Sequence, residues 1–299
     1  MTRKAARLAA FIRIVSSIIL ALTLVAFGSP ALAAHADTDP CAAQSAALDQ
    51  IQQQIDAHNA EPHTFIVPEE QAAADAYDAE ADQLNATAAQ AESALQDCQD
   101  TLGVLANSGP NAPPLKTQAP DSLRDKLNDA KAKLPPNVQQ YTSPDAKGNW
   151  RIPPQLRQLY DLLRNKNPGL TGQPYLQNEP PPQAGDPDPA YPGRTIQAKA
   201  GPPGQPPTPD LRADHIIPLA QLLNEPGFLE LNADNMYMVS RAPLNLQWLS
   251  ARANSLKASK SAADMENLDP AWQDQQVTLE NSVRSQLRQV IQQLIASQH

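Results

Sequence analysis

The sequence predicts a mainly α-helical protein with a small α+β domain at its C-terminal end. Aromatic residues make up only 4% of the 299-residue chain, which is too few for a single core of that length. The 30 prolines, against 11 glycines, favour helices joined by stiff connections. Patterns typical of strands occur around residues 214–217 and 245–248. The formal net charge of −9 argues against a generally basic protein that coats nucleic acid.

Residues 1–36 predict a secretory signal peptide. Four basic residues come first, and an apolar run from Ile14 to Phe27 follows them. Small residues then offer cleavage sites after Ala33 or Ala36. Because the apolar run is shorter than the roughly 20 residues that span a bilayer, we expect a secreted, extracellular protein with no stable membrane anchor after cleavage. A retained N-terminal anchor is the alternative.

Residues 37–108 predict an acidic hairpin of two α-helices. No Lys or Arg occurs within residues 14–115, whereas 14 acidic residues lie within 37–100. Two segments rich in Ala, Gln and Leu, Ala42–Asn59 and Glu69–Leu105, predict the helices. The negative charge would repel nucleic acid, so we expect the hairpin to meet an immunity protein or a surface partner, if it binds anything.

The two cysteines of the chain, Cys41 and Cys98, both fall in this hairpin. In an exported chain they predict one disulfide, which would join the free ends of two antiparallel helices. Closing a loop of this length stabilises a fold by about 4 kcal/mol in the chain-entropy model. His58 and His63 flank the break between the helices, and we interpret them as surface or turn histidines rather than as a metal-binding pair.

Residues 109–192 predict a Pro-rich linker with short helices. The stretch from Pro110 to Pro209 holds 22 of the 30 prolines. Two helices are expected within it, around Ser122–Leu134 and Pro154–Asn165. The rest is expected to be extended polyproline II or disordered chain, which would make this segment a spacer. Recognition of the segment by a partner protein is the alternative.

Residues 193–299 predict the small α+β domain. The stretch Asp214–Ile217 is rich in β-branched residues, and apolar and polar residues alternate over Asn245–Trp248, so both are typical of strands. Ser250 is a suitable N-cap for a helix over Ala251–Ser261. These elements would carry an acid, an imidazole and a carboxamide towards one point.

Two further helices complete the expected domain. Residues Leu219–Leu231 predict a helix and a turn between the two strands. Residues Trp272–Ser297 predict one amphipathic helix, which would cover the open side of the strands. A free helix that binds a partner is the alternative for this last element.

The residue types point to metal-assisted acid–base chemistry. Aspartate and asparagine oxygens are hard ligands that suit Mg²⁺ or a similar ion and leave positions open for water and phosphate. A histidine next to the aspartate on a strand faces the other way, so it is free to act as a base near neutral pH.

Three blocks of this segment resemble the HNH, or His-Me finger, nuclease family: Asp214-His215-Ile216-Ile217-Pro218, Asn245-Leu246-Gln247 and Asn254-Ser255-Leu256-Lys257. The resemblance covers roughly residues 194–265. It implies a ββα-metal finger in which His215 is the general base, while Asp214 and Asn254 bind one divalent ion. Mg²⁺ is the expected ion, with Mn²⁺ or Zn²⁺ as alternatives. The segment has no cysteine, so the structural zinc of many relatives is not expected.

The resemblance also implies roles for four other residues. Asn245 would tie its strand to the loop behind His215, and Lys257 would lie near the scissile phosphate. Arg212 and Lys260 are candidate contacts to the substrate, although a solvated surface role suits each of them equally well. His215, Asn245 and Lys257 thus form the expected catalytic group.

The sequence as a whole predicts a secreted metal-dependent endonuclease that hydrolyses phosphodiester bonds of nucleic acid, with DNA favoured. A scavenging enzyme and an antagonistic toxin both fit. The alternative is a non-enzymatic secreted helical protein that binds a partner or has a structural role and retains an inactive HNH-like fold. A peptidase is disfavoured because the chain lacks a Ser-His-Asp elbow, a Cys near a His and a His-Glu-x-x-His pair.

Overall fold

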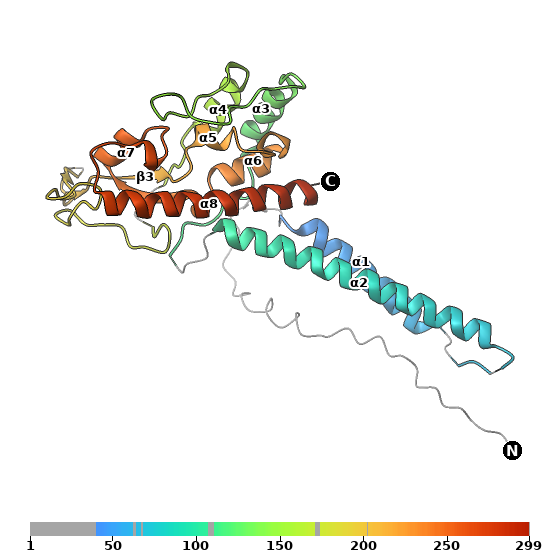
Figure 1. Ribbon diagram of the computed structural model, residues 1–299. Coiled ribbons are helices and arrows are strands. Elements are labelled where there is room, and N and C mark those ends of the chain that lie inside the picture. The colour runs from blue at the N-terminus through green and yellow to red at the C-terminus, as the bar shows by residue number, and fades with distance from the viewer. Residues whose placement is uncertain are drawn as a thin grey trace. The chain divides into compact units, whose positions relative to one another are not determined.

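The computed structural model describes residues 40–61, 64–66, 68–106, 111–170, 174–201 and 203–298 (Figure 1). The chain divides into two compact units, the first ending at Gln99 and the second beginning at Asp100. The predicted signal peptide, residues 1–36, lies outside the described residues. Within the described ranges, no helix has the length and apolar character needed to cross a membrane.

The first unit is a helical hairpin. Helix α1 (Ala42–Ala60) precedes helix α2 (Gln71–Ala106), whose last residues belong to the second unit. The predicted disulfide is confirmed: Cys41 and Cys98 are bonded, with their Cα atoms 5.9 Å apart. At the other end of the hairpin the rings of His58 and Tyr77 stack with centroids 3.9 Å apart, so the helices are antiparallel.

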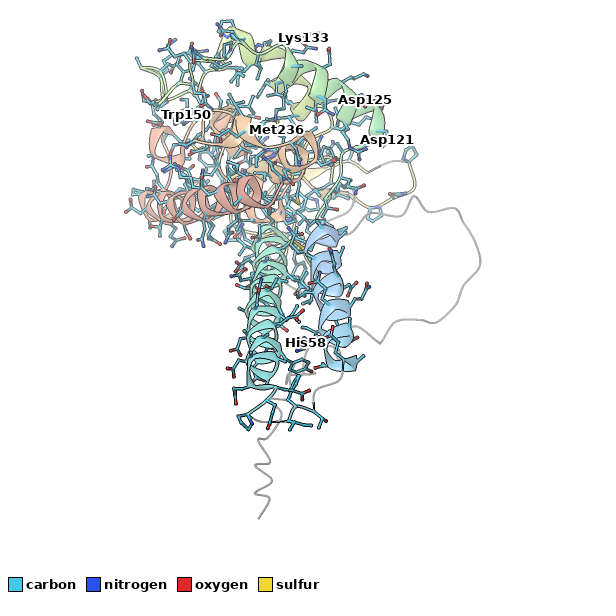
Figure 2. The ribbon with its side chains drawn as sticks, turned by 90° about the vertical axis from the view of Figure 1, so that its right-hand side faces the viewer. His58, Asp121, Asp125, Lys133, Trp150 and Met236 are labelled. Carbon is cyan, nitrogen blue, oxygen red and sulfur yellow. A yellow bond between two sulfur atoms is a disulfide. The ribbon has the colours of Figure 1, made fainter. Side chains whose placement is uncertain are left out.

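His58 does not lie on the surface, and the interpretation of it as a surface or turn histidine is wrong (Figure 2). The residue is only 2% exposed, and the carboxylate of Glu80 lies 3.6 Å from its Nδ1. The ring of Tyr77, from α2, stacks on the imidazole and covers one of its faces. His63 lies outside the described residues.

The second unit combines helices with two small antiparallel sheets, in agreement with a mainly α fold that contains a little β structure. Its first half contains helix α3 (Asp121–Ala132), turn η2 (Pro154–Leu156), helix α4 (Arg157–Arg164) and strands β1 (Ala198–Lys199) and β2 (Thr208–Pro209). Its second half contains β3 (Leu211–His215), α5 (Leu219–Leu222), η3 (Phe228–Glu230), α6 (Ala233–Ser240), η4 (Pro243–Asn245), β4 (Leu246–Ser250), α7 (Ala251–Lys257), η5 (Ala262–Asp264) and α8 (Pro270–Ser297).

The segment expected to be a Pro-rich spacer packs into the second unit instead. Both of its predicted helices are present as α3 and α4. Four leucines of α3, η2 and α4 are fully buried in the same core as residues of α5, α6 and α8: Leu127, Leu156, Leu159 and Leu163. Spacings of three and four residues give α4 one apolar face, and Pro154 stands at the start of η2 before it. Pro154 therefore marks the start of this helical segment.

Strands β3 and β4 and helix α7 form a ββα arrangement. The strands are antiparallel, with Asp214 opposite Gln247 and His215 opposite Leu246. Helix α7 follows β4 directly, and the Ser250 hydroxyl accepts a hydrogen bond from the Ala253 N–H at 3.2 Å, as expected of an N-cap. The sheet of β3 and β4 is two strands wide, so this ββα arrangement depends on its surroundings for burial.

Helix α8 supplies much of that burial. Its Trp272 packs in one cluster with Leu249 of β4 and Ala253 of α7. Farther along, apolar residues of α8 enter the main core: Val283, Leu287, Val290, Ile291 and Leu294. The apolar face of α8 is therefore covered by other residues of the chain. Met236 of α6, labelled in Figure 2, is buried in the same core. The sequence predicts a helix and a turn over Leu219–Leu231, and the structure has α5 and η3 there. A further helix, α6, follows and begins after its N-cap residue Asn232.

Candidate active site

A cavity of about 520 Å³ opens beside the end of β3 and the helix α7. Four of the predicted site residues line it together: Arg212, Asp214, His215 and Asn254. Three others, all of them described, line no part of it: Asn245, Lys257 and Lys260. The strand and helix that carry the resemblance thus bring the expected base and both expected metal ligands to one cavity.

The Pro-rich segment lines the same cavity. Tyr160 and Arg164 come from α4, and Asn167 comes from the chain just after it. Sequence reasoning missed all three because it assigned the segment to a spacer. The signal that could have found them is the helical spacing of the leucines in 156–163, which predicts a packed helix with a polar outer face.

His215 is the last residue of β3, and its imidazole is half-buried. Its Nε2 lies 3.0 Å from the carbonyl oxygen of Ser240. A carbonyl oxygen can only accept, so we assign the ring proton to Nε2, which leaves Nδ1 unprotonated in the neutral ring. Desolvation lowers the pKa of His215 below its ordinary value, so the ring is neutral at pH 7. Nδ1 is therefore available as a base.

The Ser240 carbonyl oxygen, at the end of α6, fixes this tautomer. It also accepts a hydrogen bond of 2.9 Å from Nδ2 of Asn167, which in turn reaches the Leu163 carbonyl oxygen of α4 at 3.2 Å. The orientation of the His215 ring thus depends on α6 and on the chain after α4. No sequence pattern identifies such a backbone acceptor, because every residue carries a carbonyl group.

Lys257 is buried against Asp214 rather than at an open phosphate-binding position. Its side chain is 1% exposed, and its Nζ lies 3.1 Å from Oδ2 of Asp214. The same ammonium donates a 2.6 Å hydrogen bond to the carbonyl oxygen of His215. Gln247 adds a weak contact of 3.5 Å to that Oδ2 atom. Lys257 therefore holds the two residues that precede the Ile-Ile-Pro block in place.

Asn245 makes the contacts expected of a structural tie. It is fully buried, its Oδ1 accepts the Ile217 N–H at 2.7 Å, and its Nδ2 donates to the Ile217 carbonyl oxygen at 3.0 Å. The backbone adds one more bond, from the Ile216 N–H to the Asn245 carbonyl oxygen. These contacts join the start of β4 to the chain directly behind His215.

The oxygen atoms of Asp214 and Asn254 form a small set of hard donors. Oδ1 of Asp214 has no hydrogen-bond or ion-pair partner among the described residues, and neither has the side-chain amide of half-buried Asn254. The described part of the chain contains no group of three or more His, Cys, Asp or Glu side chains that could hold a metal. Oxygen donors from two residues that line a water-accessible cavity suit an ion such as Mg²⁺, which keeps several waters.

The two predicted substrate contacts differ in position. Arg212 is exposed, lines the cavity and pairs with Asp210 at 2.7 Å. Lys260 is half-buried, and its backbone bridges to Asn149 outside the cavity lining. Arg164, which was not among the predicted contacts, lines the cavity, whereas Lys260 does not.

In comparisons with known proteins, no family model matches this chain, and no curated protein or solved structure was found to be similar to it.

Proposed function

We propose that this protein is a metal-dependent endonuclease that hydrolyses phosphodiester bonds of nucleic acid, with His215 as the general base. One observation carries the proposal. His215, oriented by the Ser240 carbonyl oxygen, lines the same cavity as Asp214 and Asn254, and each of these two residues keeps a side-chain oxygen without a partner among the described residues. A base beside an ion-binding position is what hydrolysis of a phosphodiester requires.

The residues have separate roles in this reaction. His215 Nδ1 takes a proton from the water that attacks phosphorus. The charge of the Asp214 carboxylate favours the resulting imidazolium, whereas the charges of Lys257 and Arg241 oppose it. The Ser240 carbonyl oxygen keeps the other ring nitrogen protonated throughout. Asp214 and Asn254 would hold a divalent ion, which supplies charge stabilisation at the phosphate oxygens when bound.

Lys257 and Asn245 act as positioning residues in this proposal. Lys257 fixes the carboxylate of Asp214 and the backbone of His215 at once. Asn245 fixes the chain that follows His215. Preorganised groups of this kind lower the cost of reaching the transition state because they need no rearrangement during the reaction.

The charge distribution favours the second unit over the hairpin as the part that would bind the substrate. The hairpin is acidic and carries no Lys or Arg, whereas residues 189–299 hold 9 basic and 10 acidic residues. A nearly neutral domain binds nucleic acid weakly and with strong salt dependence. We propose export through the signal peptide of residues 1–36, with DNA as the favoured substrate and the hairpin as a contact for an immunity or surface partner.

Plasmid cleavage by the mature chain tests this function. The protein used is residues 37–299, because segment 109–192 belongs to the core of the second unit. Mg²⁺, Mn²⁺ and Zn²⁺ are compared with a chelator. Changing His215→Ala should reduce cleavage by about 10²–10⁴-fold, whereas the control His58→Ala, in the first unit, should leave the rate unchanged. Equal cleavage by the His215→Ala variant and the wild type would remove the base assignment.

One contact favours a second function. The ammonium of Lys257 neutralises Asp214, which weakens the attraction of that carboxylate for a cation. A chain that binds no ion here would be a non-enzymatic secreted helical protein that binds a partner and retains an inactive HNH-like fold. Calorimetric titration of Mg²⁺ and Mn²⁺ separates the two functions. Binding that Asn254→Ala weakens supports the nuclease, and no binding by the wild type supports the second function.

A further inference from the structure

We propose that α4 is a binding surface for the sugar-phosphate backbone of the substrate and guides it into the cavity of His215. We call Arg157, Tyr160 and Arg164 the α4 strip. The proposal rests on the nuclease function above and assigns substrate binding to a segment outside the ββα finger. Its ligand is the phosphate backbone common to nucleic acids, so the strip would bind without regard to base sequence.

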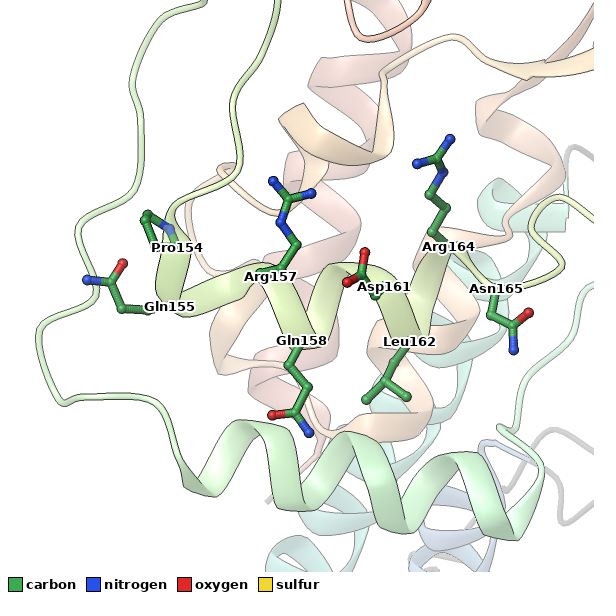
Figure 3. Close-up of a pocket in the computed structure, with 8 residues that line it drawn as sticks. All are labelled: Pro154, Gln155, Arg157, Gln158, Asp161, Leu162, Arg164 and Asn165. Carbon is green, nitrogen blue, oxygen red and sulfur yellow. The ribbon is translucent and has the colours of Figure 1, made fainter.

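The helical geometry places both arginines on one exposed face. The inward positions of this helix are the fully buried Leu159 and Leu163. Arg157 and Arg164 are exposed and seven residues apart, which is two turns and about 10.5 Å along the axis at 1.5 Å per residue. Both project from the same side of α4 in Figure 3. The helix thus offers two cations in a row.

The strip is continuous with the candidate active site. A broad hollow of about 820 Å³ along η2 and α4 is lined by residues from Pro154 to Asn165, among them Arg157 and Arg164 (Figure 3). Arg164 also lines the cavity of His215, and so does Tyr160. A strand lying along the hollow would therefore reach the catalytic histidine by way of Arg164.

The two guanidinium groups of the strip are available for an anion. Within the described residues no carboxylate lies within ion-pair distance of Arg157 or Arg164, whereas five arginines of the same unit have such a partner: Arg124, Arg151, Arg212, Arg284 and Arg288. Each strip arginine instead lies with its guanidinium carbon 5.8 Å from the centre of the Tyr160 ring. A planar guanidinium held over an aromatic ring can still donate two parallel hydrogen bonds to a phosphate.

Asp161 is the one acidic residue that lines the hollow, and it provides a test of opposite sign. It is exposed and lies four residues after Arg157 and three before Arg164. Its negative charge opposes the approach of a phosphate. Removing that charge should therefore strengthen binding, whereas removing either arginine should weaken it.

The experiment measures binding of a fluorescein-labelled DNA oligonucleotide by anisotropy, in a His215→Ala background that prevents cleavage. In about 50 mM salt, Arg157→Gln with Arg164→Gln should weaken binding by about tenfold or more, and the salt slope should fall by about two. Asp161→Asn should tighten binding about twofold to threefold. The matched control is Arg194→Gln, because Arg194 is exposed, lines neither cavity and has no carboxylate partner among the described residues.

The outcomes separate this inference from the nuclease proposal. If the wild type cleaves plasmid but the strip variants bind like Arg194→Gln, the strip assignment is overturned and the nuclease stands. If the strip variants lose binding and Asp161→Asn gains it, the strip is supported even where cleavage is absent. Failure of the parent protein to bind the oligonucleotide at all overturns the strip. Tighter binding by the Asp161→Asn variant cannot result from misfolding. The strip can therefore be tested with this variant even if the arginine variants fail to fold.

Discussion

The two units of this molecule are stabilised in different ways. The hairpin has a small apolar cluster, made of Ile51, Ile55, Leu84 and Ala88, and one disulfide between its helices. The second unit has no cysteine, and its core collects buried side chains from the end of α2 to the end of α8. The hairpin therefore depends on a covalent constraint, whereas the second unit depends on burial.

The two units also differ in whether they bury charged side chains. The described carboxylates of the hairpin are exposed apart from half-buried Glu92. The second unit buries Asp214, Glu225 and Glu280, each with cationic or hydrogen-bonding partners. A buried charge needs a rigid and fully bonded surrounding, which a two-helix hairpin does not provide. The unit with the larger core is thus the one that can hold charged side chains in fixed positions.

The largest loss of stability should come from breaking the buried ion pair of Lys257 and Asp214 in the second unit. Lys257→Met leaves the Asp214 carboxylate buried without its cation, which should destabilise the second unit by about 3–5 kcal/mol. All three tryptophans, Trp150, Trp248 and Trp272, lie in that unit, so urea unfolding followed by tryptophan fluorescence reports on it. The surface pair of Lys133 and Asp129 supplies the control.

Lys133→Met should cost less than about 1 kcal/mol, because both members of that pair are largely exposed. If Lys257→Met costs no more than this control, the pair is not a structural support and the positioning role fails. Restoring part of the lost stability with a second change, Asp214→Asn, would confirm that the uncompensated carboxylate is the cause.

The disulfide should matter almost as much, but only to the hairpin. Replacing Cys41 and Cys98 by serine should cost the hairpin about 4 kcal/mol, because the loop it closes spans 57 positions. Far-UV circular dichroism should lose helical signal from α1 and α2 at lower temperature. The tryptophan transition of the second unit should stay within about 0.5 kcal/mol of the wild type. A large shift of that transition would contradict the independence of the two units.

A core leucine of α4 tests whether the Pro-rich segment belongs to the second unit. Leu159 is fully buried, so Leu159→Ala should cost about 2–5 kcal/mol in the tryptophan transition. The matched change Leu256→Ala removes a leucine that is 47% exposed and should cost far less. A spacer would give the reverse result, with no cost at Leu159.

The extent to which the sequence predicts this fold depends on how local each signal is. The disulfide and the helices α1, α2, α7 and α8 follow from local composition, spacing and caps, and their bounds agree within a few residues at most ends. The convergence of Asp214, His215 and Asn254 follows from an ordered set of motifs. Each of these signals can be recognised within one element or one pair of elements.

The remaining features depend on tertiary packing. Both helices of segment 109–192 are predicted from the sequence, but their burial depends on apolar partners in α5, α6 and α8. The burial of Lys257 and the Ser240 carbonyl contact to His215 arise where separate elements meet. Neither contact can be recognised from the sequence near one of its two partners alone.

Asn167 tests whether the Pro-rich segment also serves the site. Asn167→Ala removes the hydrogen bond to the Ser240 carbonyl oxygen that holds His215. We expect kcat for plasmid cleavage to fall about tenfold, which corresponds to about 1.4 kcal/mol, with KM little changed. Asn128→Ala, on the exposed side of α3, should have no effect. An unchanged kcat in the Asn167→Ala variant would mean that the segment supports the fold alone.

The smallest effect concerns pH, and only the unit that buries carboxylates should show it. Glu280 of α8 accepts hydrogen bonds from the Ser261 hydroxyl and, at 2.7 Å, from the Ala262 N–H. Desolvation nevertheless raises the pKa of Glu280 above its ordinary value of 4.5. The folded state thus binds this proton more tightly than the unfolded state, and the stability contributed by the protonated form is lost as pH rises above 4.5 through the folded pKa.

Glu280→Gln removes this titration and keeps an oxygen that accepts the Ala262 N–H. The stability of this variant relative to the wild type should therefore rise as the pH increases from about 4 to about 7, measured by urea unfolding followed by tryptophan fluorescence. Glu266→Gln, at an exposed position, should show no such trend. If both variants depend on pH alike, burial of Glu280 does not control its protonation. Glu280 would then be charged in the folded protein, and its hydrogen bonds from Ser261 and Ala262 would offset the cost of burying that charge.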